Sequence, residues 1–349
     1  MSKEKTSLYR KYRPNNFKDV IGQEHVVSAL EGAIKNDRVA HAYLLYGTRG
    51  IGKTTLARIF AAELGTASED LYEIDAASYT GVDNIRELNA SVKALPYNSK
   101  YKVYIIDEVH MLSKSAFNAL LKTIEEPPAH VIFILATTEL EKVIDTVVSR
   151  CQVFTLKTPS IETLKTLIGK VAEEEKLKLS AGSINTIALL GDGSFRDTLG
   201  TLQKIMTMSG DKELSDDEVQ KITGAPTTQT IQDLISSLGA GDTGAALMSL
   251  HQANTNGVDA RTLSLQVIHY LRSLLLIRFS KELHQELEKD LGKDMFDFLM
   301  TLRGKEAIHA NAKLLTKMLE ASYATQRAHT PYLPLELAII SHGESINSS

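Results

Sequence analysis

The chain has 349 residues, of which 43% are hydrophobic and 23% are charged, and its formal net charge is −4. This length is sufficient for two or three domains with ordinary buried cores, and the composition excludes a disordered or fibrous chain. The net charge excludes a globally basic nucleic-acid coat, but it leaves room for a local basic stripe.

The sequence carries no sign of a membrane or secretory destination. No apolar run approaches the ~20 residues that span a bilayer, and residues 1–14 lack the apolar core of a signal peptide. The single cysteine, Cys151, allows no internal disulfide and no cysteine-built zinc site, which agrees with a reducing compartment. We therefore expect a cytoplasmic protein.

Between residues 40 and 155, five short apolar runs alternate with longer segments of helical period. The runs are AYLLY, LYEID, KVYIID, HVIFILAT and CQVFTL. Because they are mostly apolar on both faces, they predict a five-stranded parallel sheet covered by helices. The intervening helices are expected to begin near Lys53, Val82, Ser113 and Lys142. Ser113 is a candidate N-cap, and its helix should end before Pro127.

The rest of the chain is predicted to be helical. After Pro159, apolar residues recur at spacings of three and four, and no convincing strand remains. The segment GAPTTQT is expected to link two helical blocks. The predicted parts are an α/β domain over 1–158, a small helical domain over 159–224, a second helical domain over 225–345 and a polar tail over 346–349.

A glycine-rich stretch, GTRGIGKTT, follows the first predicted strand. It matches G-x-x-x-x-G-K-[ST] through Gly47, Gly52, Lys53 and Thr54, with a strand before it and a helix after it. In that setting, backbone N–H groups and the helix N-terminus form a cradle for phosphate. The motif predicts that Lys53 reaches the β and γ phosphates and that the Thr54 hydroxyl binds Mg²⁺. The alternative is a glycine-rich turn that binds nothing, which this context disfavours.

The segment YIIDEVH is an apolar strand that ends in two acids, as a Walker B segment does. Asp107 is expected to hold Mg²⁺, usually through water, and Glu108 to polarise the water that attacks the γ-phosphate. Two acids after a strand are otherwise a common solvated strand end. Their pairing with a phosphate-binding motif in the same sheet favours the catalytic interpretation.

Further polar residues could sense the γ-phosphate or neutralise the charge that develops on it. Thr137 and Thr138 end the strand ILATT, although threonine is also ordinary in strands. Arg150 precedes the last strand and could reach into a neighbouring subunit. Arg196, near the start of a helix, could fold over the nucleotide. Taken alone, each arginine would be interpreted as a surface charge.

These elements, with their flanking residues, resemble one family closely, the γ/τ subunit of the bacterial DNA polymerase III clamp loader, an AAA+ ATPase. The matching segments cover most of the first 200 residues, and DEVHMLS followed by FNALLKTIEEPP is more specific than any phosphate-binding loop. They are YRKYRPNNFKDVIGQEHVV, HAYLLYGTRGIGKTTLARIFA, IDAASYTGVDNIREL, YKVYIIDEVHMLSKSAFNALLKTIEEPP, VIFILATTE, VVSRCQVF and GSFRDTL. The later TPYLPLELAII resembles the last helix of the family's oligomerising collar.

The resemblance implies roles at matching positions. ATP would be bound by Gly47, Thr48, Arg49, Gly50, Ile51, Gly52, Lys53, Thr54 and Thr55. Thr54 and Asp107 would hold Mg²⁺, and Glu108 would act as the base. Thr138 would be sensor 1, with Thr137 as the fallback. The remaining roles fall to Ser149, Arg150 and Cys151 as the SRC motif, Arg150 as the trans finger, Arg196 as sensor 2, and Tyr9, Arg13, Val20 and Ile21 around the adenine and ribose.

The chain departs from the family pattern in two places. Family members usually carry a four-cysteine zinc module after the helix that follows the phosphate loop. Here that interval is only GTASED, between Leu64 and Leu71, so zinc is expected to be absent. The chain also stops after the collar-like helices, so it resembles the shorter γ form.

The resemblance therefore implies an ATP-driven subunit of the DNA-directed DNA polymerase III holoenzyme, which loads a sliding clamp on primed DNA. Its helical parts would be the lid and the collar, and its partners would be the clamp, the δ and δ′ subunits and further copies of itself. Contacts with the DNA backbone are expected from Ser113, Lys114 and residues 80–86. The alternatives are a non-hydrolysing structural subunit, like δ′, and a different DNA motor such as a branch-migration helicase.

Overall fold

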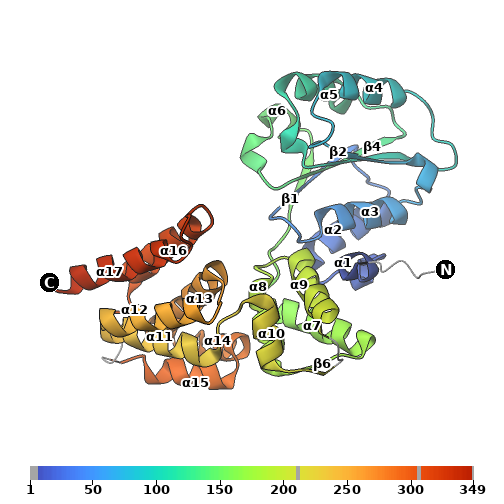
Figure 1. Ribbon diagram of the computed structural model, residues 1–349. Coiled ribbons are helices and arrows are strands. Elements are labelled where there is room, and N and C mark those ends of the chain that lie inside the picture. Colours follow the sequence, from blue (N-terminus) through green and yellow to red (C-terminus); the bar gives the residue numbers. More distant parts are fainter. Residues whose placement is uncertain (1–6, 210–212, 305–307, 348–349) are drawn as a thin grey trace. The chain divides into compact units, whose positions relative to one another are not determined.

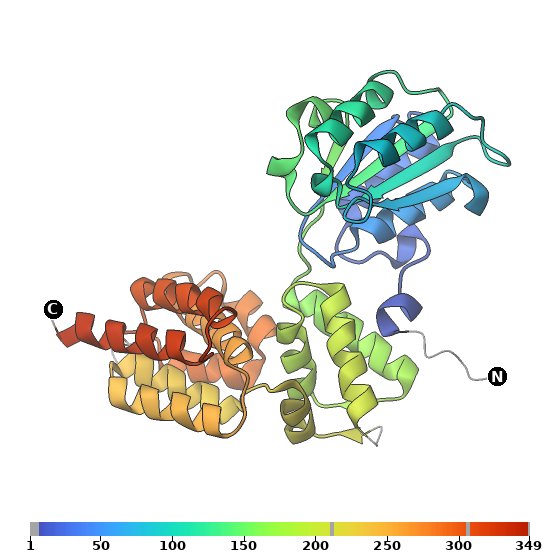
Figure 2. The same cartoon turned by 45° about the horizontal axis from the view of Figure 1, so that its top comes forward.

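The structure is a computed structural model that describes residues 7–209, 213–304 and 308–347. The chain divides into two compact units (Figures 1 and 2). The first unit extends to Thr163 and includes Gly193–Asp197, and the second comprises Leu164–Asp192 and the residues from Thr198 onward. In the described ranges, no helix is both long enough and apolar enough to cross a membrane.

The first unit contains a parallel sheet with the strand order β2-β3-β4-β1-β5. The strands are β1 (Ala42–Tyr46), β2 (Leu71–Asp75), β3 (Lys102–Asp107), β4 (Val131–Thr137) and β5 (Gln152–Thr155). The prediction of five parallel strands is confirmed. Burial on both faces, however, holds only for the three central strands, because β2 and β5 form the edges of the sheet and remain partly exposed.

Helices cover both faces of this sheet (Figure 1). On one face lie α4 (Val82–Ser91), α5 (Lys114–Glu125) and α6 (Asp145–Val148), whose apolar side chains share a core with β3 and β4. On the other face, α2 (Glu24–Lys35) and α3 (Lys53–Glu63) pack against β1. Ser113 is the N-cap of α5, as predicted, and its hydroxyl accepts a hydrogen bond from the Ala116 N–H at 3.2 Å.

The prediction that a helix begins near Lys142 is wrong. The residues there form a single 3₁₀ turn, η4 (Leu140–Lys142), and α6 begins only at Asp145. The intervening Val143 and Ile144 have extended backbone angles, which β-branched residues favour, so they interrupt the helical pattern.

The N-terminal segment contains elements for which no prediction was made. These are α1 (Leu8–Lys11), the 3₁₀ turn η1 (Phe17–Asp19) and α2. At the start of α2, the buried Gln23 side chain bonds both backbone groups of Lys157, donating to its carbonyl at 2.7 Å and accepting from its N–H at 2.9 Å. This pair of bonds fixes the chain where it leaves β5.

The second unit is helical. The helices are α7 (Ile161–Glu175), α8 (Ala181–Leu190), α9 (Phe195–Met208), α10 (Asp216–Thr223), α11 (Thr228–Ala240), α12 (Thr243–Thr255), α13 (Ala260–Phe279), α14 (His284–Leu291), α15 (Lys293–Thr301), α16 (Ala312–Thr325) and α17 (Leu333–Asn347). The first residues of α7 and α9 belong to the first unit and the rest of both helices to the second. The helices from α11 onward share one large apolar core. Helices α8 and α13 contact each other, and Lys165 of α7 donates to the Asp290 carbonyl at 2.6 Å. The predicted boundary between two helical domains at residue 224 stays a prediction.

The second unit also departs from expectation in two details. Strands β6 (Lys178–Leu179) and β7 (Glu213–Leu214) pair in parallel, although no strand was expected after Pro159. Two residues are too few to produce a period in the sequence. Helix α17 continues to Asn347, into the stretch predicted to be a polar tail, and residues 348–349 lie outside the described part.

Candidate nucleotide-binding site

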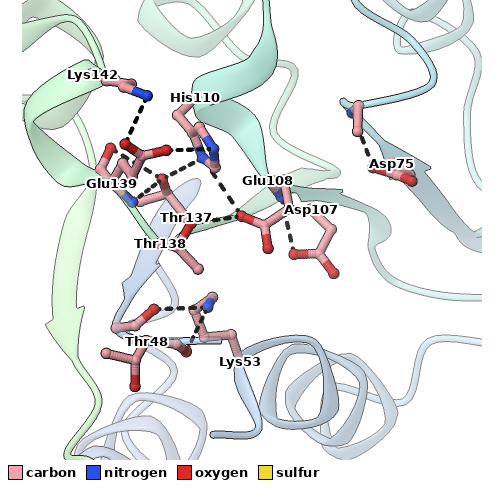
Figure 3. Close-up of polar contacts among 12 residues, drawn as sticks. Thr48, Lys53, Asp75, Asp107, Glu108, His110, Thr137, Thr138, Glu139 and Lys142 are labelled. Carbon is pink, nitrogen blue, oxygen red and sulfur yellow. Dashed lines mark hydrogen bonds and ion pairs between the residues drawn. The ribbon is translucent and has the colours of Figure 1, made fainter. Parts of the chain in front are cut away.

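The strand order brings the predicted site residues to one edge of the sheet. Strand β4 lies between β1 and β3, so the loop after β1, the end of β3 and the end of β4 meet at the carboxyl edge. Tyr46 lies opposite Thr137, and the next N–H, from Gly47, donates to the Thr137 carbonyl at 3.2 Å. Ligands of open parallel sheets bind outside this edge, so the topology supports the predicted location (Figure 3).

The glycine-rich loop encloses the Lys53 side chain (Figure 3). Lys53 is only 5% exposed, and its ammonium donates to the carbonyls of Gly47 at 2.8 Å and Thr48 at 3.0 Å. Burial lowers the pKa of Lys53, and the nearby carboxylates of Glu108 and Asp107 oppose this change. The lysine is therefore held inside the loop at the start of α3.

Gly50 joins this loop to the start of α9, within the first unit. Its φ is +77°, and a Cβ there would lie 2.0 Å from the Ser194 hydroxyl. The N–H of Arg196 approaches the Gly50 carbonyl at 3.4 Å, and the guanidinium carbon of Arg196 lies 5.9 Å from the centre of the Tyr9 ring. The sensor 2 candidate thus lies against the phosphate-binding loop.

Asp107, which ends β3, and Glu108, which follows it, take different positions. The Thr54 hydroxyl donates to one Asp107 oxygen at 2.5 Å, and the Glu108 N–H donates to the other at 3.0 Å. The hydroxyl and the carboxylate together form an oxygen pair of the kind that Mg²⁺ prefers. Among the described residues, no group of three or more His, Cys, Asp or Glu side chains could hold a metal ion.

Glu108 has a left-handed backbone, with φ of 50°. Its carboxylate accepts a hydrogen bond from the Thr138 hydroxyl at 3.2 Å. The Thr137 hydroxyl, in contrast, is buried and bonds the backbone of Glu139. The structure therefore distinguishes the two threonines, because only Thr138 contacts the predicted base.

The sequence prediction did not include His110, which lies on the 3₁₀ turn η3 (Val109–Met111) directly after Glu108. Its ring contacts Thr137, Glu108 and Glu139. The only signal in the sequence is its place in DEVH, two residues beyond Glu108, and that spacing alone does not predict a contact.

The SRC segment lies apart from these residues. The partners of Arg150 are the Glu125 carboxylate at 2.7 Å, the Thr146 carbonyl at 2.8 Å and the Ser149 hydroxyl at 3.3 Å. None of them belongs to the phosphate-binding loop of the same chain. Cys151 is partly buried, and burial raises the pKa of its thiol to about 12. The trans role of Arg150 stays a prediction.

The residues expected around the adenine are partly assembled. Arg13 is half-buried, and burial first, then the charges of Arg58 and Arg196, lower the pKa of its guanidinium. Val20 packs against the core on the α3 face of the sheet. Arg13 and Arg196 bring positive charge close to Tyr9, whereas the nearby Arg58 is paired with Glu73. Contacts of Tyr9, Arg13, Val20 and Ile21 with a nucleotide stay predictions.

The residues expected to contact DNA lie at two neighbouring helix N-termini. The Ser113 N–H donates to the Thr80 carbonyl at 3.3 Å, which places the start of α5 beside the start of α4. Lys114 is exposed, and Arg86 forms an exposed ion pair with Asp83 at 2.8 Å. The structure brings these residues together, and their contact with DNA stays a prediction.

Two protein-family models match the chain. The model described as DNA polymerase III, delta subunit, matches residues 22–75 and 65–160. The model described as DNA polymerase III subunits gamma and tau domain III matches residues 214–342. Both the α/β region and the later helical region are thus similar to DNA polymerase III subunits.

Among solved structures, the RuvB Holliday junction branch migration motor of Thermotoga maritima is similar in fold. It is 23% identical, with a TM-score of 0.53 over 73% of this chain and 91% of that one. A T158V mutant of the same RuvB gives a TM-score of 0.52. At this identity the likeness shows the fold alone, which is the AAA+ fold.

Curated relatives are more similar in sequence. The tau subunit of Bacillus subtilis is 38% identical over 355 residues, covering 96% of this chain and 62% of that protein. The tau subunit of Escherichia coli is 33% identical over 348 residues, covering 94% and 53%. This chain therefore spans only part of the length of these tau subunits. The gamma subunit of Buchnera aphidicola is 33% identical over 339 residues, covering 86% of this chain and 91% of that protein. The chain belongs to the gamma/tau subunit family of DNA polymerase III.

Proposed function

We propose that this chain binds ATP with Mg²⁺ and hydrolyses ATP as a motor subunit of the DNA polymerase III clamp loader. One observation carries the proposal: the Thr54 hydroxyl lies 2.5 Å from the Asp107 carboxylate, beside the enclosed Lys53. Membership of the gamma/tau family supports the clamp-loading role.

The loop of residues 47–55 would bind the phosphates through its backbone N–H groups and the N-terminus of α3. Lys53 would exchange its carbonyl partners in the loop for the β and γ phosphates. Thr54 and Asp107 fit Mg²⁺ because their two oxygens already lie together. When bound, Mg²⁺ would neutralise charge on the phosphate oxygens.

Glu108 would accept the proton of the attacking water, and Thr138 would sense the γ-phosphate while donating to the Glu108 carboxylate. Arg196 would bring positive charge to the phosphates as sensor 2. The adenine and ribose would be surrounded by Tyr9, Arg13, Val20 and Ile21. Arg196 lies close to Tyr9, so the positive charge that would meet the phosphates borders the position proposed for the adenine and ribose.

Arg150 would act on the ATP of a neighbouring subunit, since its partners lie outside its own phosphate-binding loop. Leaving Glu125 would cost little, because an exposed ion pair is worth about 0–1 kcal/mol. Because each bound ATP would then be contacted by two subunits, ATP binding would tighten a ring of subunits. That ring, with δ and δ′, would hold an opened sliding clamp and admit primed DNA, whose phosphates would meet the N-termini of α4 and α5.

Two alternatives are less well supported. A structural subunit like δ′ would not need an intact set of Lys53, Thr54, Asp107 and Glu108. This chain keeps all four residues: Lys53 is bound by its loop, Thr54 donates to Asp107, and the Glu108 N–H donates to Asp107. A branch-migration motor like RuvB shares the fold, but at 23% identity that likeness says nothing about the activity.

The test is the rate of ATP hydrolysis by the full chain, alone and mixed with δ, δ′, clamp and primed DNA. We expect stimulation by clamp and primed DNA together, and loss of activity in Lys53→Ala and Glu108→Gln. Only Lys53→Ala should also lose nucleotide affinity. Absence of stimulation would argue against clamp loading, and strand displacement without any clamp would favour the branch-migration motor.

A further inference from the structure

His110 lies between two carboxylates at the carboxyl edge of the sheet (Figure 3). Its side chain is only 6% exposed. The ring atom Nε2 is 3.2 Å from a Glu139 oxygen, and Nδ1 is 3.0 Å from the Thr137 hydroxyl and 3.5 Å from a Glu108 oxygen. The ring thus joins the residue after β3 to the residues that end β4.

The side of the ring that faces Glu139 is a fixed anchor. An ionised carboxylate only accepts hydrogen bonds, so Nε2 donates to Glu139, and Nδ1 can hold the Glu108 carboxylate only as a second donor, in the doubly protonated ring. Glu139 is itself held, by the Lys142 ammonium at 2.7 Å and by a bond from its own N–H to the Thr137 hydroxyl at 3.0 Å. The hydrogen bond and charge of Lys142 keep the pKa of Glu139 below its usual value, so it remains an acceptor at neutral pH.

The other side of the ring contacts Glu108, the predicted base. The same Glu108 oxygen, Oε2, that accepts from Thr138 also faces His110 Nδ1. A glutamate has three side-chain torsions, and this one begins from a left-handed backbone position on a tight turn. Two partners on one oxygen restrict those torsions. A misplacement of about 1 Å in a reacting group can lower a rate by about 10²-fold.

We propose that His110 is a positioning residue, which is anchored by Glu139 and Thr137 and holds the Glu108 carboxylate in the orientation that activates water. The proposal rests on the proposed role of Glu108. The competing explanation is that His110 merely ties the end of β3 to the end of β4. In that case it would affect stability and not the rate of hydrolysis.

Two amide substitutions separate the two sides of the ring. His110→Asn places an amide where Nδ1 stands, so it keeps a donor for Glu108 and loses the contact with Glu139. His110→Gln places an amide where Nε2 stands, so it keeps the Glu139 contact and loses the one with Glu108. Both replace a buried ring by a smaller polar group, which makes each the control for the other.

The experiment measures kcat for ATP hydrolysis, the Kd for ATP and the melting temperature of the full chain, alone and with δ, δ′, clamp and primed DNA. For His110→Gln we expect kcat to fall at least tenfold while Kd stays within twofold of the parent. For His110→Asn we expect kcat within about threefold of the parent. Equal kcat losses in the two variants, or no loss in either, would overturn the proposal, as would a loss that follows melting temperature alone.

Glu108→Gln separates this proposal from the proposed function. If Glu108→Gln abolishes hydrolysis and His110→Gln does not, the role of His110 is wrong and that of Glu108 stands. If Glu108→Gln leaves hydrolysis intact, the assignment of the base itself fails. In the Glu108→Gln background, adding His110→Gln should lower the residual rate no further, because the second change acts through the first.

Discussion

At the scale of single residues, Gly50 is the position where the phosphate-binding loop has least room. A side chain there would suffer both a left-handed φ of +77° and a clash with Ser194, which is buried. We expect Gly50→Ala to lose about 1–2 kcal/mol of stability from backbone strain and about 1–3 kcal/mol more from overpacking. It should also weaken ATP binding, because the loop must shift.

Gly65→Ala is the matched control for this change. Gly65 has nearly the same φ, +76°, but a Cβ there would have no atom within 4 Å. It should therefore show the backbone cost alone and keep the parent's affinity for ATP. Chemical unfolding and ATP titration of both variants check the prediction, which fails if the two lose equal stability and affinity.

Cys151 shows how burial controls reactivity. Because burial raises the pKa of its thiol to about 12, the thiolate that reacts with alkylating agents is scarce in the folded protein. We expect alkylation at pH 8 to be slower than that of an unfolded chain by two orders of magnitude or more. Mass spectrometry of the alkylation time course measures the rate, with guanidinium-unfolded protein as the reference. Equal labelling rates for the folded and unfolded chains would contradict the prediction.

At the scale of elements, Asp70 fixes the connection between α4 and β3. This carboxylate, buried just before β2, accepts hydrogen bonds from the N–H groups of Tyr97 at 2.6 Å and Asn98 at 2.9 Å. Burial has the largest single influence and raises the pKa of Asp70. The bonds from Asn98, Tyr97 and Ser99 together outweigh it, so the pKa lies below the usual 3.8.

A folded pKa below the unfolded value means that this stabilisation is present above about pH 4 and is lost as the pH falls further. We therefore expect Asp70→Asn to lower the melting temperature at pH 7 and to differ much less from the parent near pH 3. Asp37→Asn, at an exposed carboxylate paired with Lys100, is the control and should change little at either pH. An equal deficit at both pH values would show that the charge of Asp70 is not the cause.

At the scale of the whole molecule, the SRC segment concerns assembly. If Arg150 completes a neighbour's site, Arg150→Ala should leave ATP affinity unchanged and lower hydrolysis in the assembled complex by about 10³-fold. Lys100→Ala, which removes another exposed cation with an ion-pair partner, should change neither ATP affinity nor the rate of hydrolysis. ATPase assays on complexes with δ, δ′, clamp and primed DNA measure the effect. If the chain alone lost the same activity, Arg150 would act within its own site.

The sequence by itself determined the elements of the α/β unit and the chemistry of its loop. The bounds of β1, β2 and β3 and the starts of α3 and α4 agree with the predicted segments, because each depends on local features: an apolar run, a cap or a glycine turn. The phosphate motif and the acids of DEVH were recognisable for the same reason. The 3₁₀ turn near Lys142 and the β6–β7 pair were missed, since neither is long enough to impose a period.

The tertiary structure alone decided which residues meet. Placing β4 between β1 and β3 set Asp107 against Thr54, chose Thr138 over Thr137 as the partner of Glu108, and enclosed His110 between Glu108 and Glu139. It also joined Gln23 to Lys157, residues 134 positions apart. Strand order and register are properties of long-range packing, so the spacing of residues along one strand or turn does not specify them.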